Sequence, residues 1–225
     1  MPIEESRMTQ SQNVQLLAVK AQQALMAALR SGQLRDGQFL SMSQLVTMLG
    51  LPLSAVREAV KHASSQGLLV TMPKRGIQVM EARPETIRDC LDFRMVLDQE
   101  GARRRIANDD LTGLGALRDR HQAFREAALR GETGKTPDGP IEVDLSLHDF
   151  LAAGLGNPQL AAAYAANRMR TAIIQNARPF LQDRIISAME EHLAIMDALE
   201  RHDADAATGA IRHHYTQTLR WWGVT

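Results

Sequence analysis

The chain of 225 residues is long enough to bury a hydrophobic core and to form one or two domains. Its formal net charge is zero, with 44% hydrophobic and 23% charged residues, a composition that is ordinary for a soluble globular protein. The single cysteine, Cys90, excludes an intramolecular disulfide, and there is neither a secretory segment near the start nor an apolar run of about 18 residues. We therefore expect a cytoplasmic protein without a membrane segment.

The zero net charge hides an asymmetry between the front and the rear of the chain. Residues 1–80 carry eight Lys or Arg against four acidic residues, whereas the remaining 145 residues carry 18 against 22. A basic front and an acidic rear suit a polyanion-binding module joined to a module that does not bind polyanions. A difference in net charge of this size between two parts of a chain also arises by chance. It therefore supports polyanion binding only if the front of the chain has a fold that binds polyanions.

Helical periodicity begins early in the chain. Residues 1–12 are polar and are expected to fray. From residue 14 to residue 30, apolar residues recur at helical spacing, which predicts an amphipathic helix that ends at Gly32. Residues 33–40 are expected to form a short connection.

Two short helices around a tight turn are predicted next. The first has an apolar face of Leu45, Val46 and Leu49 and ends at Gly50, where a left-handed residue is needed. Ser54 is expected to cap the second helix. The buried stripe of the second helix consists of Val56, Ala59, Val60 and Ala63.

A two-stranded hairpin with a basic tip is expected to follow. Gly67 ends the second helix, residues 68–71 and 77–80 are predicted strands, and the turn between them reads Pro73-Lys74-Arg75-Gly76. Two helices and such a hairpin form a winged helix-turn-helix, a shape whose second helix fits the DNA major groove. We assign residues 1–80 to this DNA-binding domain.

The rest of the chain is predicted to be all-helical. After a linker at residues 81–84, helical patterns separated by short connections and by one clear loop, residues 131–140, suggest an antiparallel bundle. The predicted helices span residues 84–107, 111–129, 141–153, 158–178, 182–201 and 204–222. The fold is therefore expected to be mainly α, with residues 81–225 forming a second, helical domain.

Polar residues interrupt the apolar stripes of three of these helices. Asp144 and His148 lie four residues apart on one face of their helix, while His192 and His214 each lie on the apolar stripe of another helix. Burying several imidazoles with a carboxylate requires either an extended hydrogen-bond network or a cation. Imidazole and carboxylate suit Zn, Ni, Fe or Mn, so a divalent metal site and a metal-free network stand as alternatives.

Arg94 also lies on an apolar stripe and is expected to point inward, where a guanidinium needs an anion. That anion can be a bound ligand or an internal carboxylate such as Asp98 or Asp144.

The remaining histidines and the tryptophans that stand out in the sequence are not assigned to a functional site. His62, His121 and His202 are expected to be solvated, and Trp221 and Trp222 to cap the bundle or to join a dimer contact.

The chain resembles the GntR family of bacterial transcription regulators, in the subfamily with the FadR-type (FCD) ligand domain, from about residue 16 to residue 219. The front motifs that carry the resemblance are Leu49-Gly50-Leu51, Val56-Arg57-Glu58-Ala59-Val60, Gly67-Leu68-Leu69 and Lys74-Arg75-Gly76. The rear motifs are Asp144-x-x-x-His148, Gly156-Asn157-Pro158, Glu191-His192-x-x-Ile195 and His214.

The resemblance implies that Asp144, His148, His192 and His214 hold a divalent metal and that Arg94 lies near the bound effector, which we expect to be a small carboxylate. It also implies that the second helix of the helix-turn-helix and the wing contact DNA. The predicted DNA-binding residues are Ser54, Arg57, Lys74, Arg75 and Gly76.

Two arginines that are common in the family are replaced here, by Ser43 and Leu53. Each arginine–guanine contact in the major groove is worth about 1–3 kcal/mol of discrimination. Either the operator differs from the one common in the family, or binding is weaker and depends more on phosphate contacts.

We therefore predict a non-enzymatic, ligand-responsive regulator that acts as a homodimer on a palindromic operator in double-stranded DNA. Two alternatives remain open. One is a metal-free regulator in which His148 and His192 belong to a buried hydrogen-bond network. The other is a metal-dependent hydrolytic enzyme, because a metal with open positions can activate water, but no general base is evident beside the site.

Overall fold

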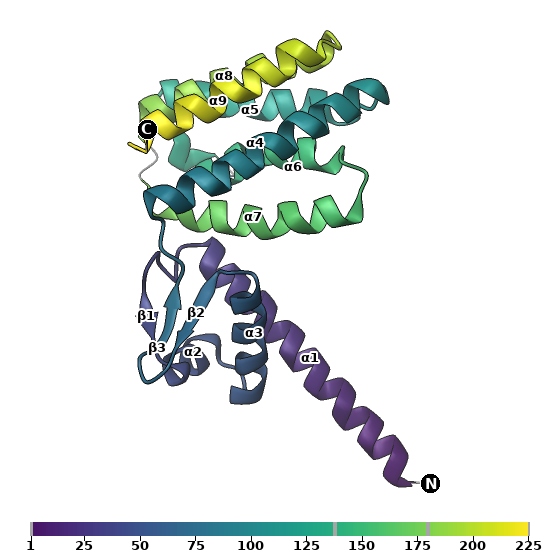
Figure 1. The fold of residues 1–225 in the computed structure, drawn as a ribbon, viewed down its shortest axis with the longest axis vertical. Helices are drawn as coiled ribbons and strands as arrows, with labels where there is room; N and C mark the ends of the chain where they lie inside the picture. Colours follow the sequence, from purple (N-terminus) through teal and green to yellow (C-terminus); the bar gives the residue numbers. More distant parts are fainter. Residues whose placement is uncertain (1, 137–138, 179–180, 225) are drawn as a thin grey trace. The chain divides into compact units, whose positions relative to one another are not determined.

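The computed structural model describes residues 2–136, 139–178 and 181–224, which form two compact units (Figure 1). The first unit comprises Met1–Ala82 with Ala172–Ala177, and the second comprises Arg83–Thr171 with Arg178–Thr225. The prediction of a mainly α-helical fold that begins with a winged helix-turn-helix is confirmed. Within the described residues, none of the helices combines the length and the apolar character that crossing a membrane requires.

The first unit opens with a long helix, α1, at Pro2–Arg30. Residues 2–12, which were expected to fray, continue this helix, because neither proline nor glycine follows Pro2 before Gly32. Its buried side chains pack against α3. These side chains are Ala21, Leu25, Ala28 and Leu29.

The helix-turn-helix consists of α2 (Met42–Leu49) and α3 (Leu53–Ser65). Gly50 ends α2 with a φ of 62°, as predicted for a left-handed C-cap. The prediction that Ser54 caps α3 is wrong. The N-cap is Pro52, whose carbonyl oxygen accepts the first helical hydrogen bond from the Val56 amide, so Ser54 lies inside the first turn.

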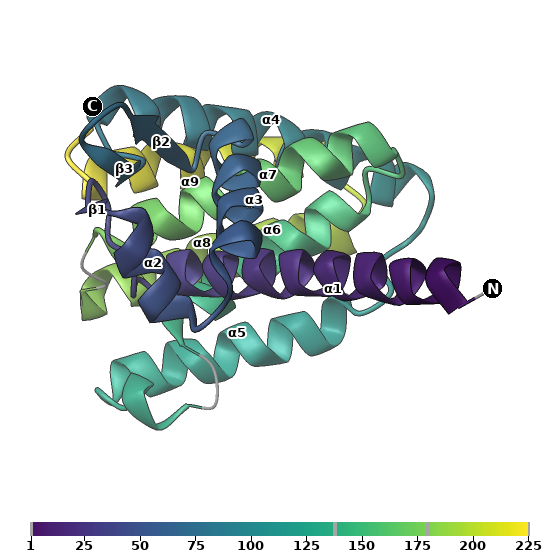
Figure 2. The same ribbon diagram turned by 90° about the horizontal axis from the view of Figure 1, so that it is seen from below.

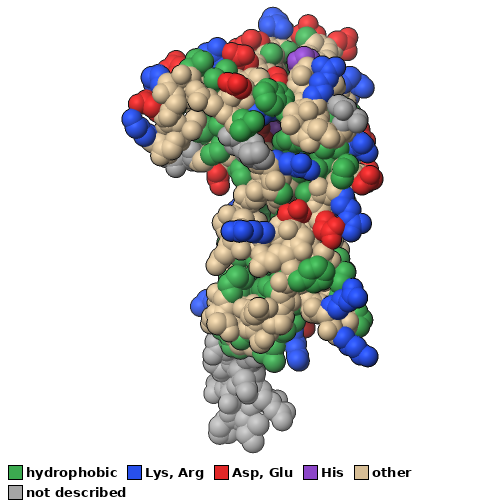
Figure 3. All heavy atoms as spheres, turned by 90° about the vertical axis from the view of Figure 1, so that its left-hand side faces the viewer, with side chains coloured by type: hydrophobic (Ala, Val, Ile, Leu, Met, Phe, Trp, Pro, Cys, Tyr) green, Lys and Arg blue, Asp and Glu red, His purple; other side chains and the backbone are tan. Residues whose placement is uncertain are grey.

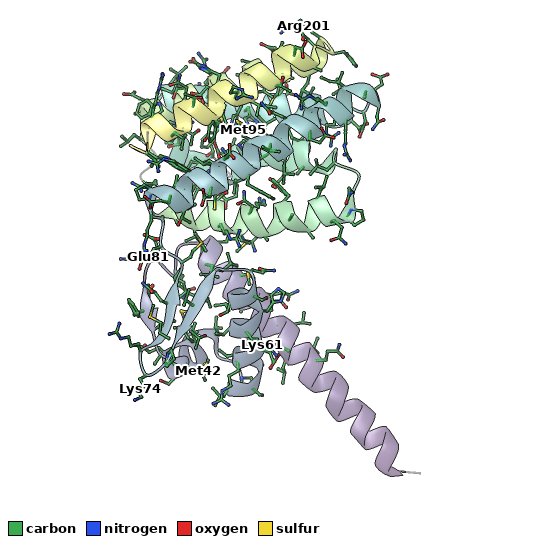
Figure 4. The ribbon with its side chains drawn as sticks, in the orientation of Figure 1. Met42, Lys61, Lys74, Glu81, Met95 and Arg201 are labelled. Atoms are coloured by element: carbon green, nitrogen blue, oxygen red, sulfur yellow. The ribbon has the colours of Figure 1, made fainter. Side chains whose placement is uncertain are left out.

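A three-stranded antiparallel sheet completes the part of this unit that the structure describes, with strand order β1-β3-β2. The wing strands are β2 (Leu69–Met72) and β3 (Gly76–Val79), each displaced by one residue from its prediction. Strand β1 (Phe39–Leu40) falls in the segment that was predicted to be a connection, because two residues are too few to show a strand period. Lys74 stands at the tip of the wing, as Figure 4 shows.

The helices of the second unit match the predicted segments closely, as Figures 1 and 2 allow the reader to follow. They are α4 (Pro84–Ala107), α5 (Leu114–Leu129), α6 (Pro140–Ala153), α7 (Pro158–Asn176), α8 (Gln182–Glu200) and α9 (Ala204–Trp221). The last turn of α7, from Ala172, is assigned to the first unit. The predicted loop at 131–140 holds a short 3-10 helix, Thr133–Lys135, and residues 137–138 of that loop lie outside the described residues. Pro179, which was predicted to break the chain between two helices, also lies outside them.

The core that positions the candidate site lies between α4, α6, α8 and α9. Gly101 of α4 lies directly against α6, because a Cβ atom added to Gly101 would meet the carbonyl oxygen of Leu151 at 2.2 Å. The close crossing of α4 and α6 brings polar residues of both helices within hydrogen-bonding distance. Buried apolar side chains surround these polar residues, among them Met95, Leu147, Leu151, Met196 and Ile211.

Candidate metal centre

The structure brings the four predicted metal ligands together. Asp144 and His148 come from α6, His192 from α8 and His214 from α9, and all four are buried. One ligand-capable atom from each residue lies within 4.8 Å of the others. The Nε2 atoms of His192 and His214 are 3.3 Å apart, and Oδ1 of Asp144 lies 3.7 Å from Nε2 of His192.

The outer nitrogen of each candidate ligand imidazole is occupied by another side chain of the protein. Nδ1 of His148 lies 2.7 Å from Oδ2 of Asp98, and Nδ1 of His214 lies 2.6 Å from Oε2 of Glu191. A carboxylate that accepts from Nδ1–H leaves the lone pair of Nε2 free to point into the cluster. Such partners fix the tautomer and the orientation of metal-binding histidines.

The inner nitrogen of His148, Nε2, favours a bound cation in the cluster over a metal-free network. Nε2 of His148 is buried and has no hydrogen-bond partner among the described residues. An unsatisfied buried polar atom costs about 1–3 kcal/mol, so native proteins rarely keep one without a function or a bound species. A metal-free network would be expected to satisfy this atom, whereas a cation would use its lone pair.

Burial keeps the imidazoles of the cluster neutral. Loss of hydration lowers the pKa of His148 and His192 well below the usual value, and it also lowers the pKa of His214. Burial by itself raises the pKa of Asp144, but electrostatic interactions with the neighbouring His148 imidazole and with the Arg94 guanidinium lower it overall. A neutral imidazole and an ionised carboxylate are the forms that bind metals.

Arg94 reaches the same cluster from α4, the helix that also carries Met95, which Figure 4 labels. Its guanidinium lies 3.9 Å from Asp98 and 4.0 Å from Asp144, and its Nη2 is 3.4 Å from Nε2 of His214. Both carboxylates are therefore close enough for an ion pair but too far for a good hydrogen bond. Its Nη1 atom has no hydrogen-bond partner among the described residues, which leaves a buried donor ready for an anion.

Sequence reasoning named Asp98 as a possible partner of Arg94, but it missed the contact of Asp98 with His148 and the role of Arg184. Burial raises the pKa of Asp98 to about 7, against the opposing effect of Arg94. On the other side of the cluster, Arg184 pairs with Glu191 at 2.8 Å and donates to the hydroxyl of Thr218 at 2.8 Å. The contacts of Asp98 with His148 and of Arg184 with Thr218 lie between helices, so periodicity along one helix gave no sign of them. The pair Arg184–Glu191 lies within α8, two turns apart.

His121 was also misjudged. It was expected to be solvated, but it is 0% exposed and its Nε2 lies 3.2 Å from Nδ1 of His192. A signal was present, because His121 lies on the apolar stripe of α5 with Leu114 and Phe124. The predicted exposure of His62 and His202 agrees with the structure.

The predicted DNA-binding residues lie on the surface of the first unit. Ser54 and Arg57 are exposed on α3, and Lys74 and Arg75 are exposed at the wing. Gly76 is half-buried, with a φ of 100° that favours glycine. Leu53 is 43% exposed at the first turn of α3, and Ser43 is exposed on α2. Their roles on DNA remain predictions.

The surface view in Figure 3 shows Lys and Arg side chains projecting from the first unit, while acidic and basic side chains alternate over the second. This distribution agrees with the charge asymmetry seen in the sequence.

Comparison with known families covers both units. Residues 17–79 match the family described as bacterial regulatory proteins, gntR family, and residues 89–217 match the FCD domain. An uncharacterized HTH-type transcriptional regulator, BphR from Paraburkholderia xenovorans, is 24% identical over 92% of this chain and 85% of its own length. The HTH-type transcriptional repressor NanR from Escherichia coli is 32% identical over 87 residues, which are 36% of this chain and 32% of the repressor.

Solved structures show the same fold. McbR/YncC from E. coli superposes with a TM-score of 0.74 at 17% identity, covering 91% of this chain and 95% of that one. A putative transcriptional regulator GntR from Rhodococcus gives a TM-score of 0.75 at 18% identity, covering 92% and 97%.

Proposed function

The chain is a transcription regulator of the GntR family with an FCD ligand-binding domain, and on that premise we propose that this domain binds a divalent metal and a small carboxylate effector. The observation that carries the proposal is the convergence of three neutral imidazoles and one carboxylate, with the buried Nε2 of His148 lacking any partner among the described residues. Asp144, His148, His192 and His214 would hold the metal. Zn, Ni, Fe and Mn are the ions that this donor set suits.

The charges of the cluster favour an anionic effector. With Asp98 ionised, three carboxylates (buried Asp98 and Asp144, and half-buried Glu191) face two buried guanidiniums (Arg94 and Arg184), and the net charge is −1. A bound divalent ion supplies positive charge and vacant coordination positions, which raises the net charge to +1. A carboxylate then neutralises the site, and burial makes this compensation necessary.

Arg94 would select and orient that carboxylate. Its Nη1 donor, which makes no hydrogen bond to any residue that the structure describes, lies 4.0 Å from Asp144 within the same buried cluster as the candidate ligands. A guanidinium binds a carboxylate with fixed geometry through parallel hydrogen bonds. An effector held in this way changes DNA affinity only if it binds one conformation of the protein better than another.

On the DNA side, we propose that a homodimer binds a palindromic operator through α3 and the wing. Ser54 and Arg57 would face bases or phosphates, while Lys74, Arg75 and the Gly76 backbone would approach the DNA backbone or minor groove. Because Leu53 and Ser43 cannot make arginine contacts to guanine, phosphate contacts would carry a larger share of the affinity.

The metal is tested first, on full-length protein purified without chelators and without a histidine tag. Elemental analysis and titration of stripped protein with Zn²⁺, Ni²⁺ and Mn²⁺ should give one ion per chain. His148→Ala should abolish this binding, whereas His202→Ala should not, because His202 is exposed and outside the cluster. Wild-type protein that binds none of these ions would leave the metal-free regulator as the better account.

DNA binding and enzymatic activity are tested separately. A gel shift on the DNA upstream of the protein's own gene, titrated with salt, should show binding that weakens as salt rises. Absence of binding even at low salt would contradict the DNA proposal. Turnover of a carboxylate by metal-loaded protein, lost in His192→Ala, would instead favour the hydrolytic enzyme.

A further inference from the structure

A fourth buried histidine, His121, lies behind the candidate metal ligands. Its Nδ1 is 2.9 Å from the carbonyl oxygen of Leu117, one turn earlier on α5, and its Nε2 is 3.2 Å from Nδ1 of His192. The His121 and His192 rings have centroids 5.2 Å apart and planes inclined at 54°. The two imidazoles therefore meet through their nitrogens and not by stacking.

The direction of these hydrogen bonds follows from their acceptors. A carbonyl oxygen only accepts, so the proton of neutral His121 lies on Nδ1 and its Nε2 carries a lone pair. That lone pair requires His192 to donate from its own Nδ1. The remaining nitrogen of His192, Nε2, is then unprotonated, and it is the atom that faces Asp144 and His214.

We propose that His121 is a positioning residue for the metal: it accepts the Nδ1 proton of His192 and thereby fixes the tautomer whose Nε2 lone pair points into the metal site. This inference rests on the proposed metal-binding function. It completes a pattern, because Asp98 and Glu191 act in the same way on His148 and His214. All three ligand imidazoles then present Nε2.

The partner of His192 differs from the other two in charge. Asp98 and Glu191 are carboxylates, whereas His121 is a neutral imidazole and increases the electron density of its ligand less. A neutral partner also adds no further negative charge to a cluster that already holds three carboxylates, Asp98, Asp144 and Glu191. His121 thus orients His192 without the electrostatic cost of burying another ion.

The test uses two substitutions at one position and one matched control. His121→Phe keeps a planar ring of similar size but removes the acceptor. His121→Gln retains an amide oxygen that can accept at the position of Nε2. His202→Phe makes the same chemical change at an exposed histidine outside the cluster.

Two readouts separate orientation from packing. The first is the affinity for Co²⁺ and Zn²⁺, measured by competition with a chromophoric chelator. His121→Phe should weaken binding about 10- to 100-fold, the range seen when partners of metal ligands are removed. His121→Gln should restore most of the affinity, and His202→Phe should leave it unchanged.

The second readout is the imidazole ¹⁵N NMR spectrum of metal-free protein. In wild type it should show His192 protonated on Nδ1. In His121→Phe it should show the proton on Nε2, or exchanging between the two nitrogens.

The outcomes distinguish this inference from the function on which it rests. Wild-type affinity and an unchanged His192 tautomer in folded His121→Phe would overturn the positioning role while leaving the metal site intact. Equal loss in His121→Phe and His121→Gln would show that ring packing, not the acceptor, matters, and would also overturn it. Wild-type protein that binds neither ion would remove the metal function and this inference together.

Discussion

Gly101 and Leu151 hold α4 and α6 at the distance that the site needs. The added Cβ that would lie 2.2 Å from the Leu151 carbonyl oxygen shows that only glycine fits between the two backbones. Each residue follows a site residue by three positions, since Asp98 precedes Gly101 and His148 precedes Leu151. The close backbone contact and the 2.7 Å contact between Asp98 and His148 are therefore parts of one helix crossing.

Replacing Gly101 by alanine should consequently destabilise the protein and disturb the site. We expect a loss of about 1–3 kcal/mol in the free energy of unfolding, because overpacking against backbone exceeds the roughly 1 kcal/mol gained in helix propensity. Metal affinity should fall as well. Gly209→Ala in α9 is the control, because nothing lies within 4 Å of its added Cβ. Chemical denaturation measures the free energy of unfolding of both variants. A Gly101→Ala variant as stable as wild type would contradict the steric argument.

Removing the charge of Asp98 should weaken metal binding without unfolding the protein. Asp98→Asn keeps the shape of the side chain and an acceptor for His148 but lowers the basicity of that imidazole. We expect metal affinity to fall about 10-fold or more. Asp92→Asn, an exposed position on the same helix, should have no effect. Calorimetric titration with Zn²⁺ compares the two, and an unchanged affinity in Asp98→Asn would count against the role of this partner.

Arg94 should matter for the effector and not for the metal. In Arg94→Gln the buried donor to the carboxylate is lost, while all four candidate ligands remain. Metal content should stay at the wild-type level, whereas binding of carboxylates from a panel of small mono-, di- and hydroxy-acids should fall about 10-fold or more. If metal-loaded wild type and Arg94→Gln bind the panel of carboxylates equally, Arg94 only forms ion pairs with Asp98 and Asp144 and does not bind the effector.

Metal removal should lower thermal stability. At a free metal concentration about 100 times Kd, binding to the folded state contributes about 2.7 kcal/mol. For a chain of this size, each kcal/mol shifts Tm by roughly 2–4 °C, so stripping the metal should lower Tm by about 5–10 °C. Thermal scans with and without chelator measure the shift, and the His148→Ala variant should show none.

The DNA-binding surface offers a test of base reading. Arg57→Ala should weaken operator binding about 10-fold, and Leu53→Arg should increase affinity for sites with guanine at the contacted position by roughly 1–3 kcal/mol. Arg212→Ala, an exposed change in the helical unit, is the control. Selection from a random duplex library identifies the preferred sites of each variant. Identical preferences for wild type and Leu53→Arg would mean that residue 53 does not face a base.

The sequence predicted what depends on local periodicity. The stripes that carry Asp144, His148, His192 and His214 pointed inward, and the structure brings these residues together. The Pro84 start of α4 and the Gly50 stop of α2 also followed from local signals. The roles of these residues in binding metal or effector remain predictions.

The rest depends on packing between helices that are distant in the chain. His121 was predicted to be solvated, and periodicity along α5 could not show that it reaches His192 on another helix. The contact between Glu191 and His214 likewise depends on how α8 crosses α9. At the start of α3, the preference of serine for N-caps pointed to Ser54, but the extended backbone of Pro52 determined where the helix begins.

The order of the ligands along the chain has a consequence for biosynthesis. Asp144 and His148 are made first, His192 comes two helices later, and His214 lies on α9. A chain cut short before α9 would therefore keep its DNA-binding unit but carry only three of the four candidate ligands.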